Sequence, residues 1–155
     1  MIPSAVADAC RLRMLSFFRP PPRLSLSEWA DEHYYLSAES GAGEPGRWHT
    51  RPSQKEIRDA FTDPEVEQIS VKKSSRVGYT KIVNAAAAYH MHQAPCAEMI
   101  VQPTIDEAEG YSKEEIAPML RDVDVLTDLV KAEAVRETKN TILRKLFPGG
   151  SLTMV

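Results

Sequence analysis

The sequence contains little cysteine and no long hydrophobic run. Its 155 residues include only two cysteines, Cys10 and Cys96, which have neither a CxxC spacing nor histidines at the spacing of metal ligands. We therefore expect two buried or idle thiols in a reducing cytosol. No apolar stretch approaches the roughly 20 residues that cross a bilayer. This argues against a membrane-spanning protein and predicts a soluble, intracellular one.

A strong charge imbalance is also lacking. The net charge is -3, with 43% hydrophobic and 26% charged residues, which are ordinary values for one globular domain. The chain as a whole is therefore not a polyanion binder. The charge is uneven, however, because residues 1–27 carry four arginines and a single acidic residue, Asp8. This arm is either simply solvated or meets nucleic acid or an acidic partner.

Common signatures of hydrolases and metal sites are missing too. The sequence has no GxSxG elbow. His90 and His92 lie two positions apart on a predicted helix, so they point to different faces and are poor joint ligands. His33 and His49 have no visible partners. We expect surface histidines and no hydrolase triad.

The first third of the chain reads as short helices separated by breaks. Residues 5–19 form a plausible amphipathic helix, which the three prolines of 20–22 end. A second helix is predicted from Ser27, as N-cap, through Glu32. Residues 37–47 contain three glycines and a proline and are interpreted as a loop, and 53–61 as a helix that starts behind a proline.

Strands and helices are then predicted in alternation. Residues 67–73 carry alternating β-branched side chains and predict a strand. An alanine-rich helix follows at 80–92, stopped by Pro95, and a short apolar strand at 97–101. The order predicts an α/β fold of parallel strands with helical crossovers.

The remaining residues predict one long helix and a hairpin. Thr104 is a candidate N-cap, and the helix should run toward Arg121 with a possible kink at Pro118. Glu114 and Glu115 are then expected on a solvated face. The segments 140–147 and 151–155 flank Pro148-Gly149-Gly150 and predict a hairpin.

The segment between the strand predicted at 67–73 and the helix predicted at 80–92 carries the chemistry. A phosphate-binding loop belongs at such a junction, and its usual pattern is GxxxxGK[ST]. The spacing is preserved here, with Gly78 and Thr80 matching. Two positions differ, because Lys73 stands for the first glycine and Tyr79 for the lysine.

The altered loop can still bind a phosphate. Binding needs inward backbone N–H groups, a helix N-terminus and a cation. Gly78 allows close approach of the backbone, and the Thr80 hydroxyl could bind Mg²⁺. The missing lysine charge could come from Lys73 or from Lys81, with Arg76 as a further cation. The plainer alternative is a basic patch on an ordinary strand-to-helix turn.

These residues resemble the variant phosphate loop of lambda-type phage terminase large subunits. Further segments agree with that family in the same order, from about Phe17 onward: Glu28-Trp29-Ala30-Asp31, Tyr34-Tyr35-Leu36-Ser37, Gly46-Arg47-Trp48, Pro52-Ser53-Gln54, Gln102-Pro103-Thr104, Glu115-Ile116-Ala117-Pro118 and Arg121-Asp122-Val123.

The resemblance implies a site for ATP and Mg²⁺. The residues expected to contact nucleotide are Lys73, Ser74, Ser75, Arg76, Val77, Gly78, Tyr79, Thr80 and Lys81, with Thr80 on the metal. Gln54 is the candidate for reading the adenine edge, or else an exposed polar residue at a helix start. Trp48 could stack on the base, although packing is the commoner role of such a residue.

The resemblance also implies a division of the chain and a set of partners. Residues 1–45 would be a short helical segment that binds the terminase small subunit, and 46–155 an incomplete P-loop ATPase domain. The family drives phage DNA into a procapsid through the portal, inside the bacterial cytoplasm, and cuts the DNA with a separate endonuclease domain.

Residues needed for hydrolysis are not found in the sequence. No apolar strand ends in Asp-Glu, the pair that holds Mg²⁺ and orients the attacking water, and the nuclease carboxylates are missing. We therefore expect a fragment that binds nucleotide at most, with apolar sheet edges and marginal stability. The alternatives are a non-catalytic interaction module or prophage remnant that binds a small subunit, and a helicase-like ATPase fragment.

Overall fold

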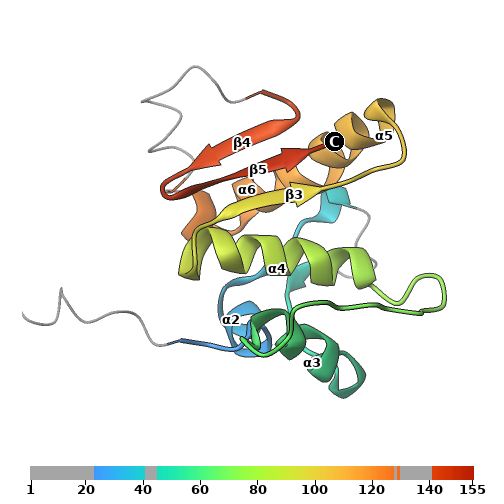
Figure 1. Cartoon of the computed structure of the whole chain (residues 1–155), viewed down its shortest axis with the longest axis vertical. Helices are drawn as coiled ribbons and strands as arrows, with labels where there is room; N and C mark the ends of the chain where they lie inside the picture. Colours follow the sequence, from blue (N-terminus) through green and yellow to red (C-terminus); the bar gives the residue numbers. More distant parts are fainter. Residues whose placement is uncertain (1–22, 41–44, 128, 130–140) are drawn as a thin grey trace, which may run out of the picture.

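A three-stranded sheet forms from the middle and the end of the chain. The computed structural model describes residues 23–40, 45–127, 129 and 141–155. The strands are β3 (Ala97–Ile100), β4 (Arg144–Phe147) and β5 (Gly150–Met154), in the spatial order β3-β5-β4 (Figure 1). β3 and β5 are parallel, and β4 is antiparallel to β5. The fold is therefore mixed α/β with a parallel strand pair.

Two adjacent glycines allow the hairpin between β4 and β5. Gly149 has φ +87°, a left-handed conformation that L side chains rarely adopt. A Cβ on Gly150 would lie 2.1 Å from the carbonyl oxygen of Cys96, at the start of β3. The hairpin prediction is confirmed, and its second glycine also permits the close pairing of β5 with β3.

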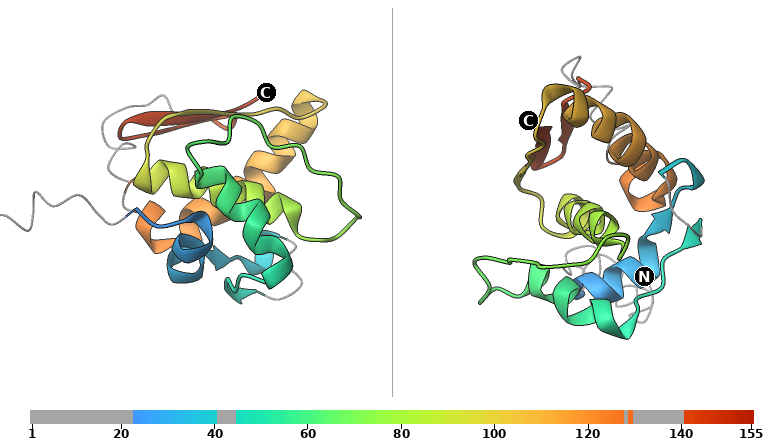
Figure 2. Two further views of the ribbon diagram at one scale, coloured as in Figure 1. Left: turned by 60° about the horizontal axis from the view of Figure 1, so that its bottom comes forward. Right: turned by 90° about the vertical axis from the view of Figure 1, so that its right-hand side faces the viewer.

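Helices cover one face of the sheet (Figure 2). Leu152 and Met154 of β5 point toward this face and are buried, whereas Met99 of β3 is 66% exposed on the other face. The helix α4 (Tyr79–Gln93) lies beside β3, and its small side chains, including the fully buried Ala85 and Ala88, let it pack closely. The helix predicted at 80–92 and the strand predicted at 97–101 are confirmed.

The long helix predicted from Thr104 is one continuous stretch with a wide turn in its middle. It consists of α5 (Ile105–Tyr111), the π-helical turn η3 (Ser112–Ile116) and α6 (Ala117–Asp122). The Thr104 hydroxyl accepts from the Glu107 N–H, so the predicted cap is confirmed. The irregularity lies in the turn before Pro118, since proline has no N–H to continue the regular ladder.

The helix α2 (Leu26–His33) begins two residues earlier than predicted, because its N-cap is Ser25 and not Ser27. The Ser25 hydroxyl accepts from the Glu28 N–H, and the Glu28 carboxylate accepts from the Ser25 N–H, which forms a capping box. Ser27 is instead buried, with its N–H bonded to Asp59. The helix predicted at 5–19 lies outside the described residues.

Short elements connect α2 to the rest of the chain. The predicted loop at 37–47 contains a 3-10 turn, η1 (Ala38–Ser40), and one strand of a small antiparallel ribbon formed by β1 (Tyr35–Leu36) and β2 (Gly46–Arg47). The predicted helix at 53–61 is confirmed as α3 (Pro52–Asp59) with the 3-10 turn η2 (Ala60–Thr62).

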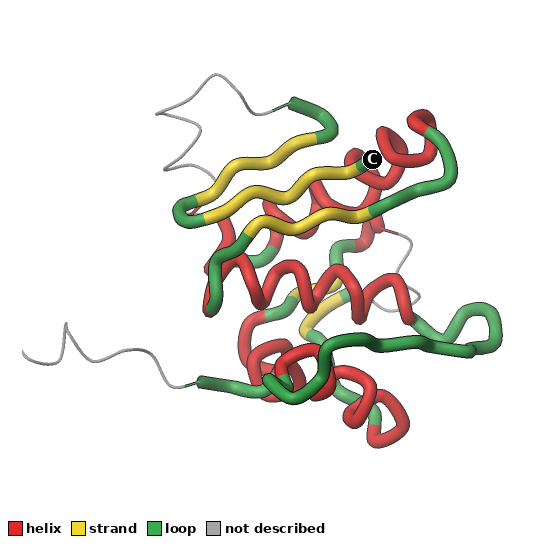
Figure 3. Tube along the Cα trace, in the orientation of Figure 1, coloured by secondary structure: helices red, strands yellow, loops and turns green. Residues whose placement is uncertain are grey.

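The strand predicted at 67–73 is wrong. These residues belong to neither sheet and connect α3 to α4 as a loop, which is drawn in green in Figure 3. Ile69 and Val71 are only partly buried. Alternating β-branched residues favour an extended backbone, but a strand also needs a paired neighbour, and none of the described segments pairs with these residues.

The described helices also bear on membrane insertion: none of those between residues 23 and 129 combines the length and hydropathy needed to span a bilayer.

Candidate functional site

The loop before α4 has an unusual backbone. Arg76 has φ 59° and Gly78 φ 76°, so two residues of this short segment are left-handed. Gly78 is the N-cap of α4, and its carbonyl accepts from the N–H groups of Lys81 and Ile82 at 3.1 and 3.2 Å. A curled backbone ahead of a 15-residue helix brings N–H groups and the positive end of the helix dipole to one place.

Gln54 lies beside this loop, although 23 residues separate it from Val77. Its side-chain amide, on α3, donates to the Val77 carbonyl oxygen at 3.1 Å. A Cβ built on Gly78 would be 3.6 Å from the same Gln54 nitrogen. The structure thus brings together the two parts of the site that the sequence predicted from separate segments.

Lys73 and Arg76 remain available at the surface. Both are exposed, as are Ser74 and Ser75, and the Lys73 ammonium lies 5.8 Å from the centre of the Tyr79 ring. Within the described ranges neither Lys73 nor Arg76 takes part in an ion pair. Their charges can therefore reach an anion without first leaving a carboxylate.

Lys81 is in a different situation. Its ammonium is 2.5 Å from Oε2 of Glu115 and also donates to the Ser40 carbonyl oxygen. Only 13% of the Lys81 side chain and 19% of the Glu115 side chain are exposed. Lys81 therefore points into the molecule, and the two candidate lysines of the loop are not equivalent.

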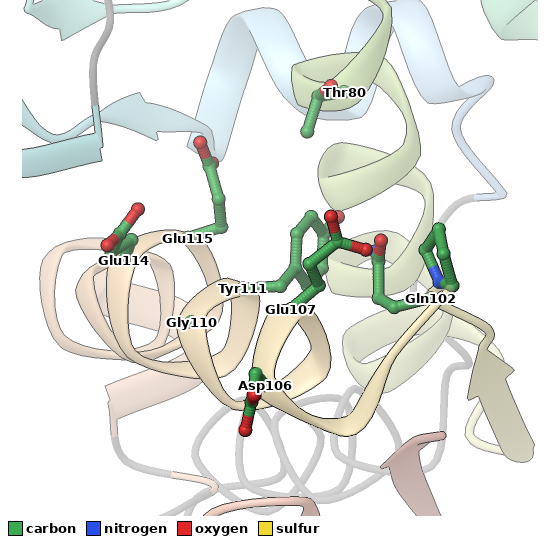
Figure 4. A pocket seen from close by; sticks show the side chains of 9 residues that line it. Thr80, Gln102, Asp106, Glu107, Gly110, Tyr111, Glu114 and Glu115 are labelled. Atoms are coloured by element: carbon green, nitrogen blue, oxygen red, sulfur yellow. The ribbon is translucent and has the colours of Figure 1, made fainter.

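Thr80 opens onto an acidic cleft between α4 and α5, shown in Figure 4. The cleft has a volume of about 700 Å³. Its other polar lining residues are Gln102, Asp106, Glu107, Tyr111, Glu114 and Glu115. The negative charge disfavours phosphate inside the cleft and favours a cation near its rim, where Thr80 lies. Among residues 23–40, 45–127, 129 and 141–155, no three histidine, cysteine, aspartate or glutamate side chains lie close enough together to hold a metal ion.

A hydrogen-bonded group that includes two of the cleft-lining residues was not predicted from the sequence. Glu115, expected on a solvated face, accepts from the Asn84 amide at 2.9 Å, and the Tyr111 hydroxyl donates to the Asn84 carbonyl oxygen. Burial and the nearby Glu115 carboxylate raise the pKa of Tyr111. Tyr111 and Glu115 are four apart on one helix, which was the available signal.

Two further predictions concern aromatic and histidine side chains. Trp48 is 6% exposed and lies under the Arg58 guanidinium, with Cζ 4.6 Å from the ring centre, so its role is packing.

His92 is not a surface histidine, because it is half-buried on α4 and its Nδ1 accepts from the Trp29 indole at 3.0 Å. Burial, and then the neighbouring His33, lower the pKa of His92.

A family model and two curated relatives that match this chain all carry the description terminase large subunit. Residues 42–155 match the family model described as phage terminase large subunit gpA, ATPase domain. The chain is 36% identical over 140 residues to the terminase large subunit of Escherichia phage lambda, and 34% identical over 144 residues to that of Enterobacteria phage P21. These matches cover 90% and 93% of the chain but 22% of each relative.

The chain thus spans about a fifth of the length of these relatives. No solved structure matches it. The family model covers most of the chain and includes the whole of the loop and its surroundings. The chain therefore belongs to the family of phage terminase large subunits, within the part that the gpA ATPase-domain model describes.

Proposed function

We propose that the chain binds ATP with Mg²⁺ through the loop 73–81, as part of a phage DNA-packaging ATPase. The observation that carries this proposal is the left-handed backbone at Arg76 and Gly78, directly ahead of α4. This geometry supports a P-loop type of phosphate site, in which backbone N–H groups and a helix N-terminus surround the anion. Such a fold has a helix after the loop and then a strand of a parallel pair. Here α4 is followed by β3, and β3 is parallel to β5.

Four residues of the loop, together with Gln54 on α3, have definite tasks in this proposal. Lys73 and Arg76 supply positive charge to the phosphates, and Gly78 leaves space because it has no side chain. The Thr80 hydroxyl, at the rim of the acidic cleft, holds Mg²⁺. Gln54 already contacts the loop through Val77 and reads the adenine edge from that position. The bound metal would neutralise charge that develops on the phosphates.

The larger assembly follows from the family and is part of the proposal. Residues 46–155 would form the ATPase portion, and 1–45 the region that meets the terminase small subunit. The longer relatives are terminase large subunits by name. We infer that the full-length counterpart of this chain acts on phage DNA at the portal of the procapsid.

The Mg²⁺ role of Thr80 gives the direct test. The Thr80→Ala variant of the 155-residue chain should bind a fluorescent ATP analogue about tenfold more weakly when Mg²⁺ is present. With EDTA the variant and the wild type should bind alike. Thr80→Ser keeps the hydroxyl and serves as the matched control. Equal affinities in Mg²⁺ for Ala and Ser variants would contradict the site, and no binding by the wild type would favour a partner-binding module instead.

A further inference from the structure

A largely buried polar cluster joins three separate parts of the chain next to the phosphate loop. Lys81 belongs to the first turn of α4, Glu115 to η3, and Ser40 to the end of η1. The Lys81 ammonium donates to Glu115 and to the Ser40 carbonyl oxygen. Asn84, only 1% exposed, donates to the same Glu115 oxygen and accepts from Tyr111.

We propose that Glu115 is a positioning residue for the nucleotide site and that Lys81 is its structural partner rather than a phosphate ligand. The proposal rests on the proposed nucleotide site. The Glu115 carboxylate accepts a hydrogen bond from the Lys81 ammonium, and Thr80 is the residue before Lys81. By fixing that turn of α4, Glu115 sets the position of Thr80 at the edge of the cleft.

The burial of the pair decides which role Lys81 has. Both side chains are more than four-fifths covered, so their charges are poorly solvated and depend on each other. If the Lys81 ammonium moved to a phosphate, it would leave the Glu115 carboxylate without its cation and the Ser40 carbonyl without its donor. Lys73 and Arg76 are exposed, and among the residues that the structure describes neither takes part in an ion pair that would have to break.

The two possible roles of Lys81 predict opposite results in a double-mutant cycle. Glu115→Gln alone leaves an ammonium without its counter-charge, and Lys81→Met alone leaves a buried carboxylate. Each single variant of the 155-residue chain should bind the fluorescent ATP analogue about tenfold more weakly than wild type. The double variant K81M/E115Q removes both charges and keeps the Asn84 contact, so it should recover to within about threefold of wild type.

A phosphate-binding Lys81 would behave differently. Glu115→Gln would then free the lysine and tighten nucleotide binding, while the double variant would stay as weak as Lys81→Met. Either result overturns the proposal. Thermal unfolding of the same four proteins gives a separate readout, and the double variant should be more stable than both single variants if the pair is structural.

The reactivity of the two lysines tests the pair without nucleotide. In the wild-type chain, acetylation by an N-hydroxysuccinimide ester, mapped by mass spectrometry, should modify Lys81 at least about tenfold more slowly than Lys73. Glu115→Gln should accelerate Lys81 and leave Lys73 unchanged. Equal rates in the wild type overturn the proposal. If the wild type shows the expected rates and binds no nucleotide, only the proposed ATP site fails.

Discussion

Gly78 provides a quantitative test of the phosphate loop. Its φ of 76° is left-handed, a conformation that costs an L-residue with a side chain about 1–2 kcal/mol. A Cβ at this position would lie 3.6 Å from the Gln54 amide nitrogen, which is an ordinary contact, so no steric clash is added. We therefore expect Gly78→Ala to lower the free energy of unfolding by about 1–2 kcal/mol, entirely through backbone conformation.

The assay is urea unfolding of the 155-residue chain followed by far-UV circular dichroism. Gly110→Ala is the matched control, because Gly110 lies in α5, has nothing within 4 Å of an added Cβ, and should gain about 0.5–1 kcal/mol. Gly78→Asn should fall between wild type and Gly78→Ala, since asparagine tolerates the left-handed region best. A Gly78→Ala chain as stable as the wild type would refute the left-handed loop.

Two other substitutions test the sheet. Gly150→Ala would place a Cβ 2.1 Å from the Cys96 carbonyl oxygen, so β5 must move away from β3. We expect the free energy of unfolding, measured in urea, to fall by about 3 kcal/mol or more. A decrease below about 1 kcal/mol would contradict the parallel pairing. Burial raises the pKa of Glu98 from 4.5 to about 8. Since the unfolded chain then ionises before the folded one, Glu98 lowers stability progressively as pH rises from about 4.5 to about 8. Glu98→Gln should match the wild type near pH 4.5 and exceed it by on the order of 1–2 kcal/mol at pH 8, given its partial exposure; a difference independent of pH would rule this out.

Local signals in the sequence were sufficient to predict α3, α4 and the hairpin. The alanine run and Pro95 define α4, and Pro148-Gly149-Gly150 defines the turn between β4 and β5. The N-cap of α2 was also readable, because Ser25 has a glutamate three positions later and Ser27 does not. These features depend on residues within a few positions of one another.

Features that depend on distant residues could not be predicted in the same way. The alternation of Ile69 and Val71 favours an extended backbone, but whether a strand forms depends on a neighbour elsewhere in the chain. The Lys81–Glu115 pair spans 34 positions, and nothing near either residue indicates it. The loop residues 73–81 were proposed as a site from their spacing and the family resemblance, whereas the contact of Gln54 with Val77 required the folded chain.

The placement of aromatic side chains has a practical consequence. Both tryptophans, Trp29 and Trp48, belong to the segments that pack beneath α4, and the strands β3, β4 and β5 contain neither tryptophan nor tyrosine. Intrinsic tryptophan fluorescence therefore reports the unfolding of the helical part of the molecule and does not report directly on the sheet. Cys96, exposed and free at the start of β3, offers the complementary position for a dye once Cys10 is replaced. Energy transfer from the two tryptophans to such a dye would report when the helical part and the sheet come apart.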